Sequence, residues 1–194
     1  MFHLEDEEDG QQHPSEALAN RILKTRSILV MGQIDQDVAE RVISQLLILD
    51  ADNHDPIRMI ITSQGGHVDS GFAIHDMMMF VESPVYTIGA GWVASIAVPI
   101  LLGAKKDHRF ALPNTRFLLH QPSGGAGGQL SDIRIEAQEI IKIRTKINEM
   151  LASETGQTVE RIAQDSDRNF WMSAEEAKKY GIISKIVKNV KDLK

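Results

Sequence analysis

Residues 57–66 read Ile-Arg-Met-Ile-Ile-Thr-Ser-Gln-Gly-Gly, an apolar run that ends in a pair of glycines. The run from Ile57 to Thr62 predicts a strand that is covered on both faces, as in a parallel sheet. The glycine pair predicts a turn from this strand into a helix, with backbone N–H groups left unshielded to hold an oxyanion or a phosphate. A tight turn without a chemical role is the other interpretation of such a short motif.

On either side of this run, strand-forming segments alternate with helical ones. We expect strands at 27–31, 57–62, 85–88 and 115–119, and helices at 15–24, 37–50, 94–102 and through 77–81. The alternation predicts an α/β fold with a mixed sheet and crossover helices. Beyond a glycine-rich segment at 123–129, we expect a long helix at 131–153, a short helix from Thr158, a helix opened by a Ser173–Glu176 capping box, and a strand at 182–187.

Composition excludes several classes of function. The 194 residues include no cysteine, so a disulfide framework, a thiolate metal site and a cysteine nucleophile are excluded. Most of the net charge of −6 comes from five consecutive acids at 5–9, and no basic patch predicts binding to nucleic acid or to a membrane surface. We expect no cofactor and no metal site, because no two histidines have helical metal-ligand spacing.

The chain is expected to form one domain. Residues 1–13 are too polar to order themselves, which predicts a disordered acidic tail without the features of a signal peptide, followed by a single domain at 14–194. The segment from 85 to 104 has no charged residue and is long enough to span a membrane. Its glycines and polar residues instead predict a buried strand followed by a short buried helix.

Two further residues lie where the predicted strands end. Ser95 follows a strand and opens a helix, so it is either a helix cap or a nucleophile whose neighbouring amide, that of Ile96, stabilises an oxyanion. Ala97 stands where the nucleophile elbow of α/β-hydrolases requires glycine, which excludes that motif. His120 ends the strand at 115–119, and sites in open α/β sheets gather at such strand ends.

In this order, the motifs resemble those of the ClpP family, the proteolytic subunits of the Clp protease. They are Ser63–Gly66, Ala94–Ser95, Ala111–Asn114, His120–Pro122, Asp165–Arg168 and Ser173–Ala177, and the resemblance covers about residues 17–187. It implies a ClpP/crotonase-type fold with a protruding handle made of a strand and the long helix. It also implies a cytoplasmic serine endopeptidase of two stacked heptameric rings, which cleaves unfolded polypeptides delivered by a Clp-family unfoldase ATPase.

Position by position, the resemblance implies that Ser95 is the nucleophile and His120 the general base and acid. The backbone amides of Gly66 and Ile96 would form the oxyanion hole. The residues implied in substrate binding are Gly124 and Gly125, and those implied in oligomer contacts are Gln129, Asp132, Asp167 and Arg168.

The third triad position departs from the family pattern. An aspartate usually follows the Asp-Arg pair, but here Asp167 and Arg168 are followed by Asn169. An amide can orient a histidine, as in papain-like enzymes, but it cannot stabilise the imidazolium with a full negative charge. We therefore expect a peptidase that is weak or conditional on its own. Asp165 and Asp167 are nearby carboxylates, although both match other positions of the family.

Two departures concern partners. Ile60 stands where a tyrosine usually contributes to the outer groove that docks the ATPase, and the acidic tail differs from the family's apolar axial loop. These differences predict weakened direct docking and favour mixed rings with a second, standard ClpP subunit. Gln64, in place of a proline, is expected to loosen the oxyanion turn.

Two other functions stay open at this point. The chain can be a catalytically silent ring subunit that builds or regulates the chamber. It can also be a crotonase-type acyl-CoA enzyme, because that fold likewise uses two backbone amides as an oxyanion hole.

Overall fold

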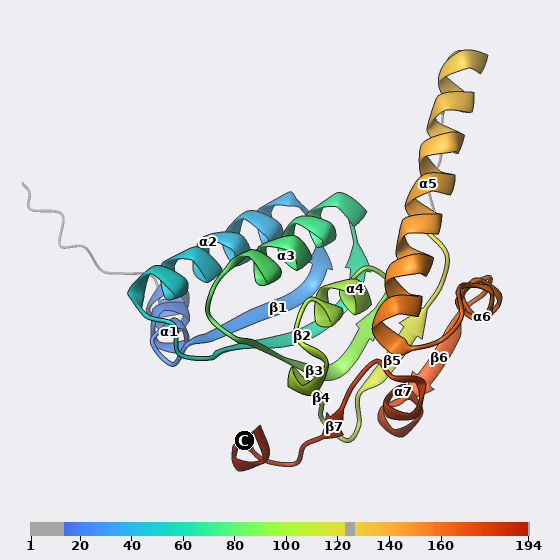
Figure 1. The fold of residues 1–194 in the computed structure, drawn as a ribbon. Coiled ribbons are helices and arrows are strands. Elements are labelled where there is room, and N and C mark those ends of the chain that lie inside the picture. Colours follow the sequence, from blue (N-terminus) through green and yellow to red (C-terminus); the bar gives the residue numbers. More distant parts are fainter. Residues whose placement is uncertain (1–13, 123–126, 194) are drawn as a thin grey trace, which may run out of the picture.

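A single mixed sheet organises the protein (Figure 1). The computed structural model describes residues 14–122 and 127–193, and the expected disordered tail at 1–13 lies outside them. Five strands run parallel in the order β1-β2-β3-β4-β7, while β5 pairs parallel with β3 and antiparallel with β6. The strands are β1 (Ser27–Ile34), β2 (Ile57–Gly66), β3 (Val85–Ala94), β4 (Arg109–Ala111), β5 (Arg116–Leu119), β6 (Phe170–Ser173) and β7 (Lys185–Ile186).

Helices connect the parallel strands and cover the sheet. α2 and α3 lie side by side, and α4 packs against α3 and against strands β2 and β3 (Figure 1). The helices are α1 (Pro14–Leu23), α2 (Gln36–Asp52), α3 (Val68–Phe80), α4 (Ala97–Leu102), α5 (Leu130–Thr155), α6 (Val159–Asp165) and α7 (Ala174–Tyr180), with short 3-10 turns at Lys106–His108 and Val190–Leu193. The predicted α/β class with crossover helices is confirmed.

The core lies between the sheet and these helices. Strand residues such as Ile28, Met59 and Phe117 are fully buried, and α4 is buried along its whole length. The uncharged segment at 85–104 forms strand β3 and helix α4, as predicted. No helix in the described parts of the chain is long and apolar enough to cross a membrane.

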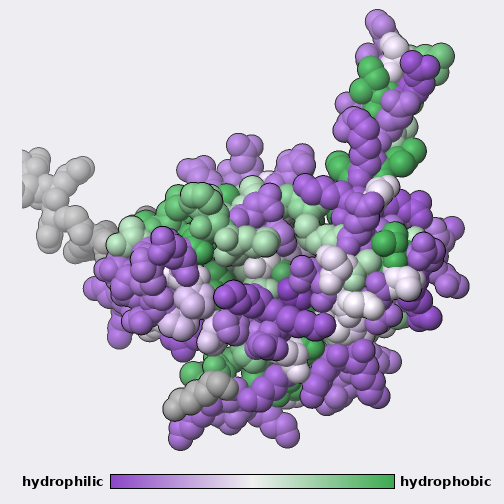
Figure 2. Space-filling model, in the orientation of Figure 1, coloured by the Kyte–Doolittle hydropathy of each residue, from purple (hydrophilic) through white to green (hydrophobic). Residues whose placement is uncertain are grey.

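Helix α5 rises away from the body of the molecule (Figure 1). Asn148 is its first buried residue, and the first half of the helix, residues 130–142, is exposed apart from the half-buried Ile140. Apolar side chains lie along this free half in Figure 2, and they include Leu130, Ile135 and Ile141, which are 84%, 53% and 63% exposed. The predicted handle consists of a strand and the long helix, and its helical part is present. The strand was expected to start within residues 123–126, which lie outside the described residues.

Several boundaries differ from the sequence prediction. β2 and β3 each extend further than expected, to Gly66 and Ala94, and α4 begins later, at Ala97. The strand predicted at 182–187 is paired only at Lys185–Ile186. The short strands β4 and β6 were not predicted, because each has only three or four residues and depends on a neighbouring strand to order it.

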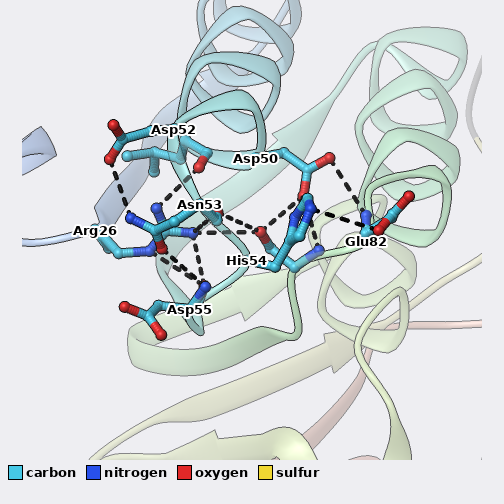
Figure 3. Close-up of polar contacts among 9 residues, drawn as sticks. Arg26, Asp50, Asp52, Asn53, His54, Asp55 and Glu82 are labelled. Carbon is cyan, nitrogen blue, oxygen red and sulfur yellow. Dashed lines mark hydrogen bonds and ion pairs between the residues drawn. The ribbon is translucent and has the colours of Figure 1, made fainter.

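The C-terminal end of α2 is closed by a polar cluster (Figure 3). The Arg26 guanidinium donates hydrogen bonds to the carbonyl oxygens of Leu49, Asn53 and Asp55, at 2.8, 3.0 and 2.6 Å. The last carbonyls of a helix have no partner within the helix, so a cation that binds them stabilises this end. Arg26 itself has a φ of 54°, a left-handed conformation that the cluster holds in place.

Asp50 anchors the other side of the same cluster. Its carboxylate accepts hydrogen bonds from the Ser83 amide (2.8 Å) and hydroxyl (2.7 Å), and His54 lies 3.2 Å away. These bonds, chiefly the one from the Ser83 hydroxyl, lower the pKa of Asp50 from 3.8 to about 2. The cluster thereby ties the end of α2 to the loop that leads into β3.

Candidate active site

Ser95 lies in a strained junction between strand β3 and helix α4. Its φ is 56°, which is rare for a residue other than glycine, and its amide donates to the Leu118 carbonyl at 3.0 Å. Helix α4 starts at Ala97 with Ile96 at its cap position, and no side chain caps it. The predicted helix start at Ala94 is therefore three residues too early, and the helix-cap interpretation of Ser95 is wrong too, so its hydroxyl makes no capping bond.

The glycine pair lies directly beside Ser95. It forms the end of strand β2 just beyond a β-bulge, where Gly65 and Gly66 pair with Gln33 and Ile34 of β1, and not a separate turn, which corrects the sequence prediction. Gly65 has a φ of 92°, and a methyl group on it would lie 2.6 Å from the Ser95 Cβ. A methyl group on Gly66 would lie 2.1 Å from the Ile34 carbonyl oxygen. Only glycines allow the three chain segments to approach this closely.

Hydrogen bonds fix the glycine segment from behind. The buried Ser63 hydroxyl donates to the Gly32 carbonyl at 2.5 Å and accepts from the Gly65 amide at 3.0 Å. With its nitrogen toward the Gly32 carbonyl and its oxygen toward the Gln33 amide, the Gln64 side chain makes two further bonds of 3.2 Å. Strand β1 therefore holds the glycine segment in place. These bonds argue against the loosening that was expected from Gln64, which stays a prediction.

Ile96 is fixed by packing against helix α3. Its side chain is 2% exposed, and a methyl group on Gly71 would lie 2.2 Å from the Ile96 Cγ1. The Ile96 side chain can therefore pack against α3 only because Gly71 has no side chain. Because Ile96 directly follows Ser95, this contact determines where the Ile96 peptide unit lies beside the Ser95 hydroxyl.

His120 and Asn169 adjoin the paired strands β5 and β6, His120 directly after β5 and Asn169 directly before β6. The antiparallel ladder of β5 and β6 ends with Leu119 facing Phe170, so His120 and Asn169 are the first residues beyond it, and both line one open depression. Beyond the ladder, Gln121 bonds to the carbonyls of Ser166 (2.7 Å) and Asp167 (3.0 Å), which holds the two chain segments together.

His120 lines two hollows. On one side it borders an open depression formed with Gln121, Pro122 and residues 167–169. On the other side it borders a small, largely apolar hollow that also contains Ser95. The remaining residues of that hollow are Val68, Ile96, Pro99, Leu119, Pro122, Ile147 and Leu151. The structure thus gathers Ser95, His120 and Asn169 in one region, with His120 in the middle.

The three side chains are neighbours without being bonded. In the described part of this single chain, no hydrogen bond joins the Ser95 hydroxyl, the His120 ring and the Asn169 amide. Catalytic hydrogen bonds are often long in the absence of substrate and tighten when it binds. The arrangement can therefore support nucleophilic catalysis once the His120 ring and the Ser95 hydroxyl are in hydrogen-bond contact.

Asp165 is not available as a substitute triad acid. Its carboxylate accepts hydrogen bonds from Arg161 Nε at 2.6 Å and from the Tyr180 hydroxyl at 2.8 Å, and its side chain is 10% exposed. Burial and the bond to Asp165 raise the pKa of Tyr180, so the phenol stays a donor. Asp167 is half-exposed at 57% and lies 3.8 Å from Arg168 Nε.

The remaining predicted residues lie outside this centre. Gln129 and Asp132 are exposed at the start of α5, and Asp167 and Arg168 are exposed at the open depression. Gly124 and Gly125 fall outside the described residues. Sequence reasoning missed Val68, Ile147 and Leu151, which line the apolar hollow from α3 and α5. The spacing of Ile147 and Leu151 places them on one helix face, but which strand that face meets is not visible in the sequence.

No group of three metal-ligating side chains occurs within residues 14–122 and 127–193. The groups that the site itself offers are a hydroxyl, an imidazole and backbone amides. A serine nucleophile needs a neighbouring base, since a hydroxyl is scarcely ionised near neutral pH. His120 is the titratable side chain that shares a hollow with Ser95.

The fold belongs to a family of serine-type proteases. The sequence model of the Clp protease family matches residues 10–190, and the chain belongs to that family as a ClpP-type proteolytic subunit. It is 51% identical to ATP-dependent Clp protease proteolytic subunit 3 of Rhizobium meliloti over 172 residues, which cover 89% of this chain and 88% of the relative. It is 46% identical to subunit 2 of Gluconobacter oxydans over 98% of this chain and 86% of that one.

A solved structure gives the same result for the fold. It is a ClpP1 asparagine-to-aspartate mutant from Listeria monocytogenes, with a TM-score of 0.85 and 47% identity, and the match covers 91% of this chain and 99% of that one. The predicted ClpP fold is thereby confirmed, and the acyl-CoA enzyme alternative is set aside because the family shown is a protease family.

Proposed function

We propose that this chain is a serine endopeptidase subunit in which Ser95 attacks the scissile carbonyl, His120 transfers the protons, and Asn169 orients His120. The observation that carries the proposal is that His120 borders both the hollow that contains Ser95 and the depression that contains Asn169. Proposed substrates are unfolded polypeptides, which are cut to short peptides.

The proposed reaction uses each residue in turn. His120 accepts the hydroxyl proton as the Ser95 oxygen bonds to the carbonyl carbon, and the backbone amides of Gly66 and Ile96 donate to the resulting oxyanion. The C–N bond then breaks, and the leaving amine takes the proton from His120. Water, deprotonated by the same imidazole, releases the acyl group and restores Ser95.

Asn169 is proposed to make this chemistry slow in the isolated subunit. In trypsin, the exchange of the triad aspartate for asparagine lowers turnover by about four orders of magnitude, which corresponds to a barrier higher by about 5 kcal/mol. An amide can hold the imidazole in place but does not stabilise its positive charge. Because Asp165 is bound to Arg161 and Tyr180, it does not supply the missing carboxylate.

The apolar hollow beside Ser95 supports a preference for apolar side chains at the residue before the cleaved bond. Val68, Ile147 and Leu151 offer no charged or hydrogen-bonding group to a substrate side chain. A charged side chain would lose its hydration there without gaining a partner. We therefore infer that apolar side chains are preferred there and that aspartate or lysine is excluded.

We also infer that the chain works in two stacked heptameric rings, as the resemblance implies. The free half of α5 supports this, because exposed apolar residues along a protruding helix indicate a surface that another subunit covers. The proposed ring contacts include Gln129, Asp132, Asp167 and Arg168. A second, standard ClpP subunit in mixed rings would supply a charged triad and a better ATPase contact.

An unfoldase of the Clp type remains a proposed partner despite the change at Ile60. Ile60 and Ile88 line an apolar hollow of about 280 Å³ on the outer side of the sheet, together with Leu112, Val187, Val190 and Leu193. A short apolar segment of a partner can fit such a hollow. The loss of the tyrosine hydroxyl removes a hydrogen-bond donor from this hollow, which supports weakened rather than abolished docking.

A fluorophosphonate probe separates this function from that of a silent ring subunit. The probe modifies a serine only when a base activates its hydroxyl, so the wild-type chain should be labelled and Ser95→Ala should not. A slow but complete labelling of the wild-type chain supports an active subunit of low turnover. Labelling equal to that of Ser95→Ala would establish the silent alternative. Native mass spectrometry of the same samples reports whether the rings contain one subunit or two.

A further inference from the structure

Two tryptophans and an arginine form a stack on the strands that carry the proposed triad. The indole rings of Trp92 and Trp171 are parallel, with an angle of 4° between their planes and 6.5 Å between their centroids. The Arg116 guanidinium carbon lies 4.7 Å from the centroid of the Trp171 ring. The chain has two tryptophans, and both take part in this stack.

Each member of the stack belongs to a different triad strand. Trp92 is on β3, which leads to Ser95, and Arg116 is on β5, which leads to His120. Trp171 is on β6, whose preceding residue is Asn169. Trp92 is the direct cross-strand neighbour of Arg116, so the stack crosses all three strands.

The alternation of the strands puts the stack on the same sheet face as two triad members. Trp171 is two residues from Asn169, and Arg116 is four residues from His120, so each pair shares a face. The aromatic contact between Trp92 and Trp171 spans β5, to which both outer strands are hydrogen-bonded. A displacement of β6 would therefore break the stack as well as its hydrogen bonds.

Strand β6 has particular need of such a contact. It has only four residues, and within the described sheet it pairs with β5 alone. An uncharged amide stabilises the histidine through a directed hydrogen bond, whose strength falls steeply with misalignment. The position of Asn169 therefore matters more here than that of a carboxylate, which also acts through its charge over longer distances.

We propose that Trp92, Arg116 and Trp171 are positioning residues that hold β6 in register and thereby keep Asn169 directed at His120. This inference depends on the proposed triad, in which Asn169 acts through His120. Trp171 and Arg116 touch neither the nucleophile nor the base in this role. Their effect on turnover passes through the placement of Asn169.

A double-mutant cycle tests the proposal. Trp171→Ala should lower kcat for a short fluorogenic peptide about tenfold with less than a twofold change in KM, and Trp171→Phe, which keeps a ring, should retain at least half of kcat. In an Asn169→Ala background, Trp171→Ala should change kcat by less than twofold, because two residues that act through one contact are not additive. Trp92→Ala gives an independent test that leaves β6 itself unaltered.

The outcomes separate this proposal from the triad. If Asn169→Ala lowers kcat and Trp171→Ala lowers it tenfold again in the same background, the stack does not act through Asn169 and the positioning role is wrong, while the triad stands. If Asn169→Ala retains the wild-type kcat, the triad itself is wrong and the positioning role with it. Circular dichroism monitors the stack directly, through the signal that arises from coupling between the two indole rings. In correctly folded protein, this signal must disappear equally in Trp92→Ala and in Trp171→Ala.

Discussion

Gly65 lies so close to Ser95 that a methyl group on its Cα would come within 2.6 Å of the Ser95 Cβ and 3.2 Å of the Ser95 Oγ. The same methyl group would lie 2.8 Å from the Ala94 carbonyl oxygen. Ser95 is held with a φ of 56°, and strain of this kind persists where the surrounding structure determines the backbone from several sides. The glycine segment is one of those sides.

Gly65→Ala should therefore abolish peptidase activity, with a loss of at least about 100-fold in kcat, as for the removal of one oxyanion donor. The new methyl group has to displace either Ser95 or the glycine segment that precedes the proposed oxyanion amide. Hydrolysis of a fluorogenic peptide and labelling by the fluorophosphonate probe are the measurements.

Gly156→Ala is the matched control for this change. Gly156 also has a left-handed φ, of 78°, but nothing lies within 4 Å of a methyl group there. Its substitution carries the backbone strain without the contact, so its kcat should stay within about twofold of wild type. Equal activity in both variants would mean that the close approach to Ser95 has no role in the reaction.

Ile147→Ala should change which substrates are cleaved. The shorter side chain enlarges the apolar hollow beside Ser95, so peptides with phenylalanine before the cleaved bond should gain over those with valine. A change of a few methylene groups in such a pocket alters the ratio of kcat/KM by about 10-fold. The ratio is independent of the concentration of active sites. An unchanged ratio would place the substrate side chain elsewhere.

The sequence predicted the layered fold well because its signals are local. The apolar run at Ile57 and the capping box at Ser173 both form the expected elements, and the box is complete, with Glu176 accepting from the Ser173 amide. Strand β4 could not be predicted in the same way. It begins with Arg109, a charged residue that is 2% exposed, and only its partners in the folded chain make a strand of it.

The site was predictable in its residue types and not in its geometry. Ser95, His120 and the glycines lie at strand ends, which the sequence indicates. The geometry depends on contacts between segments far apart in the chain, as the left-handed φ of Ser95 and the packing of Ile96 against Gly71 show. The stack of Trp92 on Trp171 likewise depends on β6, a strand that short-range propensity does not predict.

Arg109 provides a test of the buried polar interior. Its guanidinium donates to the carbonyl oxygens of Leu102 (2.9 Å) and Ala104 (2.7 Å) and pairs with Glu154. Arg109→Met should lower the free energy of unfolding by about 3–5 kcal/mol, because Glu154 and the carbonyls lose their partner. Glu154→Gln, at a side chain that is 37% exposed, should cost less than half as much. Urea unfolding measures both, and equal losses would contradict the explanation.

Asp50 should give the protein a component of stability that depends on pH. Its pKa is about 2 in the folded chain against an ordinary value of 3.8, so folding favours the charged form. This stabilisation is complete above about pH 4 and is lost as the pH falls toward 2. Its upper limit is on the order of 2 kcal/mol, lower after allowance for the 19% of the side chain that is exposed.

Asp50→Asn removes this component. At pH 7 the variant should unfold at lower urea concentration than the wild type, and the difference between the two should shrink as the pH is lowered from 4 to 2.5. A difference that is constant over this range would show that the carboxylate charge contributes nothing and that the hydrogen bonds to Ser83 act alone.

The rate of hydrolysis of one short fluorogenic peptide by the wild type, Asn169→Asp and Asn169→Ala, measured on assemblies of matched size, tests the proposed triad most directly. Asp165→Asn serves as control, because it removes a nearby carboxylate that is bound to Arg161 and Tyr180. We predict a kcat at least about 10-fold higher for Asn169→Asp, at least about 10-fold lower for Asn169→Ala, and unchanged for Asp165→Asn. Equal rates for the wild type and both Asn169 variants would contradict the account, since His120 would then be oriented by some other group or not be the base.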